Sequence, residues 1–274
     1  GFALTRNGQF NIDKQGYIVT PLGDRLMGYQ VEDPISGDVR APATVTADAF
    51  RTMVIPSSGV GAAVTTEVGL SLNLSADAEV IPTPAAPAAP INPNDPETYS
   101  YSTALKIFDS LGKEHSLSLY FVRRTDVVDT TATPPTYSEW EAFTVIDNVP
   151  ADPLEPNAII RFDGLGRVAE VEPQVTVPGV TPPTNGSLFS AMLGTDAVNP
   201  SVISLAMNSI TQFGGKSTPR ELTQNGSAPG EIAGLSISRN GTIQARYTNG
   251  ITKDIGIVNL TTVRNNNGLS PIGN

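Results

Sequence analysis

The chain has 274 residues, enough for one large domain or two of ordinary size. Its 17 basic and 27 acidic residues leave a net charge of −10, which repels nucleic-acid phosphates and anionic membranes. Cysteine does not occur, which excludes disulfides, thiolate metal sites and cysteine nucleophiles.

Turn-forming residues are frequent. The 23 prolines and 25 glycines disfavour long helices and favour many short strands, so we expect an all-β, mainly antiparallel fold. No apolar run approaches the roughly 20 residues needed to cross a bilayer. The first ten residues also lack the apolar core of a secretory signal.

A hairpin opens the chain at "TRNGQFNIDKQGYIV", residues 5–19. Phe10 and Ile12 alternate with polar neighbours, and Tyr17 and Val19 repeat the pattern across a glycine-containing turn. This predicts two antiparallel strands with one buried face. Because the chain begins inside this motif, we expect that an upstream segment has been removed. Further strands are expected at residues 25–31 and 50–56.

A longer strand is predicted next, where four apolar residues alternate strictly: Val68, Leu70, Leu72 and Leu74. Residues 81–97 follow, with a proline at every third position, the period of a polyproline II helix. This segment has two interpretations. It is either a docking ligand for an aromatic groove or, as we favour because strands of one domain flank it, a stiff surface loop.

The middle of the chain predicts further hairpins. Residues 102–123 turn at Asp109–Gly112, residues 139–147 form a strand, and residues 158–171 turn at Asp163–Gly166. Residues 186–194 have the pattern of a short helix. Residues 202–210 alternate again and predict a strand.

The last part begins with a loop-like segment, residues 214–230, and continues with three strands separated by Asn240–Gly241 and Asn249–Gly250. The two ends of the chain share this pattern of short strands and glycine-containing turns, and the tripeptide of residues 6–8 recurs at 239–241. We therefore predict two β domains, the second inserted into the first. The discontinuous domain comprises residues 1–57 and 223–274, and the inserted domain comprises residues 58–222 with a proline-rich loop at 81–97.

No catalytic, cofactor-binding or metal-binding site is predicted. Gly164, Gly166 and Ala169 match a dinucleotide-binding spacing, but a return strand is expected where that motif needs a helix. The single histidine, His115, follows a hairpin turn without a nucleophile motif nearby, and we expect it to be solvent-exposed. Three aspartates near predicted loops, Asp109, Asp147 and Asp163, are expected to cap turns rather than to bind metal.

Three blocks of the sequence resemble bacterial flagellar hook proteins. The blocks are the opening hairpin with "LMGY" (residues 26–29), the hairpin "STALKIFDSLGKEHSLSLYFVR", and the segment from "ITQFGG" to "VRNNNGL". The resemblance implies a non-enzymatic structural subunit. Such subunits self-assemble into a curved tube, a universal joint that transmits motor torque to the filament.

Further expectations follow from this resemblance. The discontinuous domain would be the inner domain of the subunit and the inserted domain the outer one. The family also has terminal helices that line the tube, and neither matches this sequence, so we expect a monomeric core fragment. Partners would be other copies of the chain and, in the whole protein, rod, hook-cap and hook–filament junction proteins. Export would follow the flagellar type III route to an extracellular location, and flexibility would reside near residues 56–63 and 214–230.

Three alternatives remain. The chain could come from another axial flagellar protein such as a distal rod subunit. It could be a secreted carbohydrate-binding β-sandwich, although aromatic residues make up only 6% and Trp140 is the single tryptophan. It could also be a hydrolase that uses His115.

Overall fold

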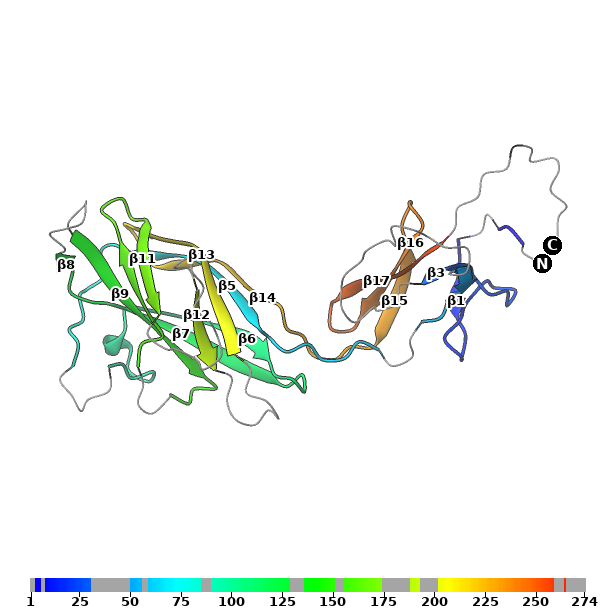
Figure 1. The fold of residues 1–274 in the computed structure, drawn as a ribbon. Coiled ribbons are helices and arrows are strands. Elements are labelled where there is room, and N and C mark those ends of the chain that lie inside the picture. Colours follow the sequence, from blue (N-terminus) through cyan, green and yellow to red (C-terminus); the bar gives the residue numbers. More distant parts are fainter. Residues whose placement is uncertain are drawn as a thin grey trace. The chain divides into compact units, whose positions relative to one another are not determined.

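A computed structural model of the chain shows two compact units (Figure 1). The structure describes residues 3–5, 8–30, 50–55, 59–84, 90–128, 136–150, 155–173, 188–192, 202–258 and 264. Unit 1 comprises Gly1–Gly61 with Pro229–Asn274, and unit 2 comprises Ala62–Ala228. The predicted fold class, all-β and mainly antiparallel with one β domain inserted into the other, is confirmed.

The first unit contains a five-stranded sheet among its described residues. Its strand order is β15-β16-β17-β3-β4. The strands are β3 (Met27–Gln30), β4 (Phe50–Thr52), β15 (Ile232–Ile237), β16 (Thr242–Tyr247) and β17 (Thr252–Val258). The pairing of β17 with β3 joins the two distant parts of the chain in one sheet, so blue and orange strands lie together in Figure 1.

The core of unit 1 comes from both parts of the chain. Its buried members are Ile18, Met53, Ile55, Val60, Ile243, Ala245, Tyr247 and Ile255. The opening hairpin of β1 (Asn11–Ile12) and β2 (Ile18–Val19) forms as predicted, but its buried face differs. Ile18 is buried while Ile12 is 44% exposed. The prediction that Ile12, Tyr17 and Val19 share the buried face was therefore wrong, because Ile18 packs beside Met53 and Ile55 from a segment that the hairpin sequence does not reveal.

The second unit contains two sheets in its described residues. One has the order β11-β10-β9-β7-β6, with β8 beside β9, and the other has the order β12-β13-β5-β14. The first comprises β6 (Tyr101–Phe108), β7 (Glu114–Arg123), β8 (Val127–Val128), β9 (Thr136–Ile146), β10 (Ala158–Phe162) and β11 (Val168–Pro173). The second comprises β5 (Glu67–Ser75), β12 (Leu188–Met192), β13 (Val202–Phe213) and β14 (Thr218–Gln224).

The larger hydrophobic core of unit 2 lies between its two sheets. It includes the alternating side chains of β5 and the large buried side chains Trp140, Phe121 and Phe162. The alternation predicted for Val68 to Leu74 is confirmed, since these side chains are at most 1% exposed. Among the strand pairs of the described residues, β5 and β13 are the exception to antiparallel pairing, since they run parallel.

Two segments of unit 2 differ from the prediction. Residues 188–192 form strand β12 rather than a helix, since they pair with β13 along the full length of β12. A segment this short is a marginal helix in water, whereas a sheet edge supplies partners for its backbone. Residues 218–224 form β14 within the segment expected to be a loop. The composition of β14 is that of an edge strand, where a proline and charged residues are tolerated.

The boundaries of the units follow from these strands. The units part after Gly61 and after Ala228, four and six residues beyond the expected boundaries at residues 57 and 222. Residue 222 itself lies inside β14, so a boundary there would remove part of a strand from its sheet.

The described ends of the proline-rich segment lie against the outer face of the six-stranded sheet. Ile91 is buried in a second cluster formed with Tyr120, Val122, Phe143 and Val145. Residues 85–89 lie outside the described part of the chain. The buried Ile91 supports the interpretation as a surface loop, because its side chain already has a partner within the unit.

Candidate functional site: the base of the inserted unit

Unit 2 begins at Ala62 and ends at Ala228. We call the two segments just inside these limits, Ala63–Glu67 and Gln224–Ser227, the base. Within the base, Ala63 and Ser227 form an antiparallel pair. The amide of Ala63 donates to the carbonyl of Ser227 at 3.0 Å, and the amide of Ser227 donates back at 2.8 Å. Entry and exit are therefore joined by backbone hydrogen bonds inside the same unit.

Asn225 strengthens this pairing through its side chain. Its Oδ1 accepts hydrogen bonds from the amides of Thr66 and Glu67 at 2.9 and 3.0 Å. Its Nδ2 donates to Thr66 Oγ1 at 2.8 Å. One side chain thus satisfies two backbone donors at the start of β5, a role that an asparagine amide can fill because it both accepts and donates.

Thr65 ties the base to the β6–β7 hairpin. It is fully buried. Its amide donates to the carbonyl of Phe108, its Oγ1 accepts from the amide of Phe108 at 2.8 Å, and the same hydroxyl donates to Gln224 Oε1. A Cβ on Gly226 would lie 2.2 Å from Thr65 Oγ1, so this close approach requires glycine.

Unit 1 has a comparable pair where its own chain segments end. Val60 and Gly230 exchange backbone hydrogen bonds of 2.8 and 2.9 Å. Gly59 has a φ of +66°, and a Cβ there would lie 2.4 Å from the carbonyl oxygen of Gly230. Each unit therefore holds both of its chain crossings by reciprocal backbone bonds and by a glycine at the point of closest approach.

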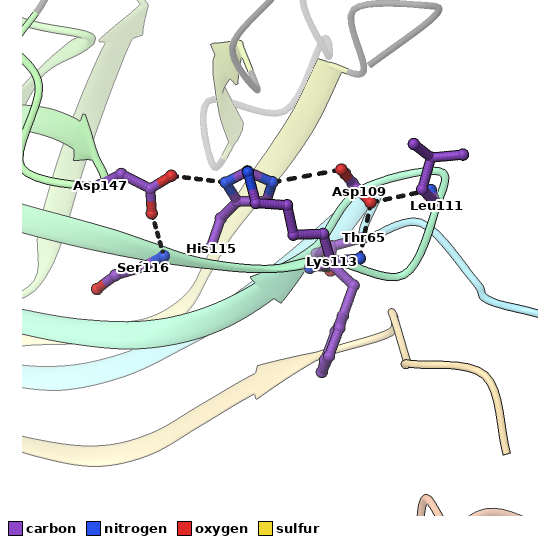
Figure 2. Close-up of polar contacts among 8 residues, drawn as sticks. Thr65, Asp109, Leu111, Lys113, His115, Ser116 and Asp147 are labelled. Carbon is purple, nitrogen blue, oxygen red and sulfur yellow. Dashed lines mark hydrogen bonds and ion pairs between the residues drawn. The ribbon is translucent and has the colours of Figure 1, made fainter. Parts of the chain in front are cut away.

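His115 lies on β7, beside the hairpin turn that follows Phe108 (Figure 2). Its Nδ1 is 2.6 Å from Asp147 Oδ2, and its Nε2 is 3.4 Å from Asp109 Oδ2. The side chain is only 10% exposed, so the expectation of a solvent-exposed turn residue was wrong. The missed signal is the alternation in β7, because His115 shares the inward face with Leu117 and Leu119.

Backbone donors orient the two carboxylates. Asp147 Oδ1 accepts from the amide of Ser116 at 2.8 Å, and Asp109 Oδ1 accepts from the amides of Leu111 and Lys113. The hydrogen bond from His115 holds the pKa of Asp147 below its ordinary value. Burial raises the pKa of Asp109, but the backbone donors and His115 outweigh this effect and the net direction is downward. Both carboxylates are therefore charged at neutral pH.

This arrangement does not have the geometry of a hydrolase. A general base needs a free ring nitrogen within reach of a nucleophile. Here each ring nitrogen faces a carboxylate, and the nearby hydroxyl of Thr65 is engaged by Phe108 and Gln224. The structure supports a positioning role for His115 within the hairpin.

The other residues considered as candidate site residues lie in turns, strands or the core of unit 2. Gly164 and Gly166 lie in the β10–β11 turn and Ala169 lies in β11, so the predicted return strand is confirmed. Asp163 caps this turn, and the Arg167 amide is the main cause of its lowered pKa. Trp140 is fully buried in the core, which excludes it from an exposed carbohydrate platform.

Within the part of the chain that the structure describes, no three histidine, aspartate or glutamate side chains are grouped so that they could hold a metal ion. Nor does a described helix combine the length and hydropathy of a membrane span.

The sequence-family model described as the flagellar basal body protein FlaE D2 domain matches residues 73–227 of this chain. The chain belongs to this family. The matched FlaE D2 segment begins in β5 and ends at Ser227, the residue paired with Ala63, so it lies entirely within unit 2.

Relatives extend the similarity beyond the FlaE D2 domain. The chain is 28% identical to the flagellar hook protein FlgE of Treponema pallidum, over 98% of this chain and 60% of that protein. It is also 28% identical to FlgE of Escherichia coli K12, over 98% of this chain and 58% of the relative. The chain thus spans about three fifths of these relatives.

A solved structure shares the fold. The crystal structure of the Helicobacter pylori flagellar hook protein FlgE2 matches with a TM-score of 0.57 at 15% identity, over 98% of this chain and 83% of that one. At this identity the similarity concerns the fold alone.

Proposed function

We propose that this chain is the β-rich part of a structural subunit of the bacterial flagellar hook. The observation that carries the proposal is the 98% coverage of this chain by proteins named flagellar hook protein FlgE in distant bacteria. The subunit would assemble with copies of itself into a curved, flexible tube that transmits motor torque to the filament. Unit 1 would form the inner domain and unit 2 the outer domain.

The base of unit 2 is suited to carrying load. Any force that passes along the covalent chain into unit 2 enters after Gly61 and leaves after Ala228, because the chain passes between the units only at these two places. Backbone hydrogen bonds join the two segments, and Asn225 and Thr65 distribute the load to β5 and β6. Residues 218–224 belong to β14, and Asn225 and Ser227 are hydrogen-bonded within the base, so the flexible segment that we propose on the exit side begins after Ser227.

The remaining parts of the proposal come from the resemblance. Partners in the whole protein would be the rod, hook-cap and hook–filament junction proteins. The location would be extracellular, after export by the flagellar type III route. The function would involve neither catalysis nor a bound cofactor.

A second candidate is another axial subunit such as a distal rod protein. This candidate is supported by the description of the matching family, which names the flagellar basal body. The two candidates differ in where the whole protein assembles and in whether the tube is curved.

The test uses the full-length protein that contains this chain. We expect it to restore swimming and curved hooks in a strain that lacks the hook protein, as seen by electron microscopy of isolated basal bodies. The matched control is the same gene in a strain that lacks the distal rod protein, where no rescue is expected. Rescue of the rod strain alone would overturn the proposal in favour of the second candidate, and rescue of neither would refute both.

A further inference from the structure

The two described flanks of the proline-rich segment lead to an inference that is independent of the proposed function. We call residues 79–84 and 90–100, which lie between β5 and β6, the strap. We propose that the strap is a releasable cover over an apolar face of unit 2, and that Arg124 holds it closed. The strap would open locally while the core between the two sheets stays folded.

The covered face lies on the side of the six-stranded sheet that points away from the larger core. Its buried side chains come from neighbouring strands and are Tyr120 and Val122 of β7 and Phe143 and Val145 of β9. The strap covers them with Ile91, which is 2% exposed, and with the partly buried Ile81 and Tyr99. Without the strap these four side chains would form a contiguous apolar patch on the surface, a feature that typically marks an interaction or aggregation site.

Arg124 holds the strap from the side of the sheet. Its side chain is 4% exposed, and its Nε and Nη2 lie 2.7 and 2.6 Å from Glu141 Oε2. Its Nη1 donates to the carbonyls of Ile81 and Pro82 at 2.9 and 3.3 Å. Burial of a guanidinium is costly unless the group is paired and hydrogen-bonded. The two strap carbonyls complete this set of bonds, so the closed strap and the Arg124–Glu141 pair stabilise each other.

The backbone contributes less to the attachment of the strap. In the part of the chain that the structure describes, two backbone hydrogen bonds join the strap to β7. The amide of Ile81 donates to the carbonyl of Arg123, and the amide of Ser100 donates to the carbonyl of Phe121, both at 2.9 Å. The prolines of the strap have no amide with which to extend this pairing. The bonds from Arg124 are therefore a large share of what holds the strap in place.

The second flank of the strap has local structure of its own. Thr98 Oγ1 accepts from the amide of Asn92 at 2.9 Å and donates to the carbonyl of Asp95. The amide of Asp95 donates to the carbonyl of Asn92, and the Asp95 carboxylate accepts from the amide of Glu97 at 3.1 Å. These bonds run within residues 92–98 and do not involve the sheet. Opening of the strap therefore breaks its bonds to β7 and Arg124 but leaves this piece intact.

Native-state hydrogen exchange tests the local opening without any substitution. We expect the amides of Ile81 and Ser100 to exchange through an opening that urea accelerates only weakly, because release of the strap exposes far less surface than global unfolding. Amides of β5, in the larger core, should exchange more slowly and follow global unfolding as urea rises. Equal rates with the same urea dependence in the strap and in β5 would overturn the proposal.

A double substitution removes the bonds from Arg124 without leaving a buried charge. Arg124→Met/Glu141→Met replaces the ion pair by apolar side chains of similar size, a change that is often neutral for stability. We expect the amides of Ile81 and Ser100 to exchange about tenfold faster or more, while β5 amides keep their wild-type rates. Unchanged exchange at Ile81 would show that Arg124 does not hold the strap.

The matched control is Arg161→Met/Glu139→Met. Glu139 and Glu141 lie two residues apart on β9 and so share a face of the sheet, and Glu139 Oε2 is 3.1 Å from Arg161 Nε. The guanidinium of Arg161 is bonded by glutamates of β9 and β11 rather than by strap carbonyls. Exchange at the Ile81 and Ser100 amides of this control should match the wild type. Equal acceleration in the two double variants would refute a specific role of Arg124.

Dye binding shows whether the apolar face is uncovered. An anilinonaphthalene sulfonate dye becomes fluorescent on exposed apolar surface. We expect its fluorescence with Arg124→Met/Glu141→Met to be about threefold higher or more than with the wild type, and unchanged with the control. Faster exchange at Ile81 without added dye fluorescence would overturn the proposal, because the strap would then not cover an accessible apolar face.

Discussion

The two units differ in which parts of the chain supply their hydrophobic cores. Unit 2 builds its core from one continuous stretch of chain and encloses Trp140, Phe121 and Phe162 within it. Unit 1 needs both parts of the chain, since β3 and β4 precede the insertion and β15 to β17 follow it. Among the described residues, its parts meet in the sheet through three residue pairs between β17 and β3. The inserted unit thus forms its core from a continuous stretch of chain. The discontinuous unit depends on the pairing of β3 with β17, which we call the seam.

The largest expected effect tests the core of unit 2. Trp140→Ala removes a fully buried indole, and we expect the free energy of unfolding to fall by about 3–5 kcal/mol. Urea denaturation followed by circular dichroism measures this loss. The control is Val128→Ala, whose side chain is 68% exposed, with an expected change within about 0.5 kcal/mol. Similar losses in the two variants would disprove the enclosed core.

A smaller effect tests the seam of unit 1. A Cβ at Gly28 would lie 2.6 Å from the carbonyl oxygen of Ile257 and 2.9 Å from Met53 Sδ. We expect Gly28→Ala to destabilise unit 1 by about 1–3 kcal/mol, because β3 and β17 must move apart. Faster hydrogen exchange in β17 measures the effect.

The matched control for the seam is Gly234→Ala in the same sheet. A Cβ at Gly234 meets nothing within 4 Å, so its exchange rates should stay close to wild type. If Gly28→Ala behaves like this control, the β3–β17 pairing does not limit the stability of unit 1.

The smallest effect concerns pH and unit 2. Asp163 has a lowered pKa in the folded chain, chiefly through its bond from the Arg167 amide. Its stabilisation is therefore complete above the unfolded value of about 3.9 and is lost as pH falls through the lower folded value. We expect Asp163→Asn to lower the melting temperature at pH 7 and the difference from wild type to shrink toward pH 2. A difference that stays constant with pH would refute this account.

Local patterns in the sequence were enough to predict most strands. The Asn–Gly pairs at residues 240–241 and 249–250 mark turns whose φ > 0 requirement glycine meets, and both hairpins form there. Alternation along β5 identified its buried side chains, because the period of a strand does not depend on its partner.

Features that depend on distant partners escaped prediction. β14 resembles a loop, since Pro219 and its charged neighbours are acceptable only at a sheet edge, and β5 provides that edge. His115 follows a turn in sequence, and its second partner, Asp147, is brought near by the pairing of β7 with β9. The base was also missed, because the bonds of Thr65 and Asn225 cross more than 150 residues.

The two strands that flank β5 in its sheet come late in the sequence, and this has a consequence for folding. β5 ends at Ser75, but both of its neighbours, β13 and β14, come after residue 201. A chain that emerges from its amino-terminal end therefore exposes an apolar strand with two open edges until more than a hundred further residues have followed. Such high contact order slows folding and leaves β5 prone to aggregation meanwhile, so a chaperone that shields residues 67–75 would speed the recovery of soluble protein.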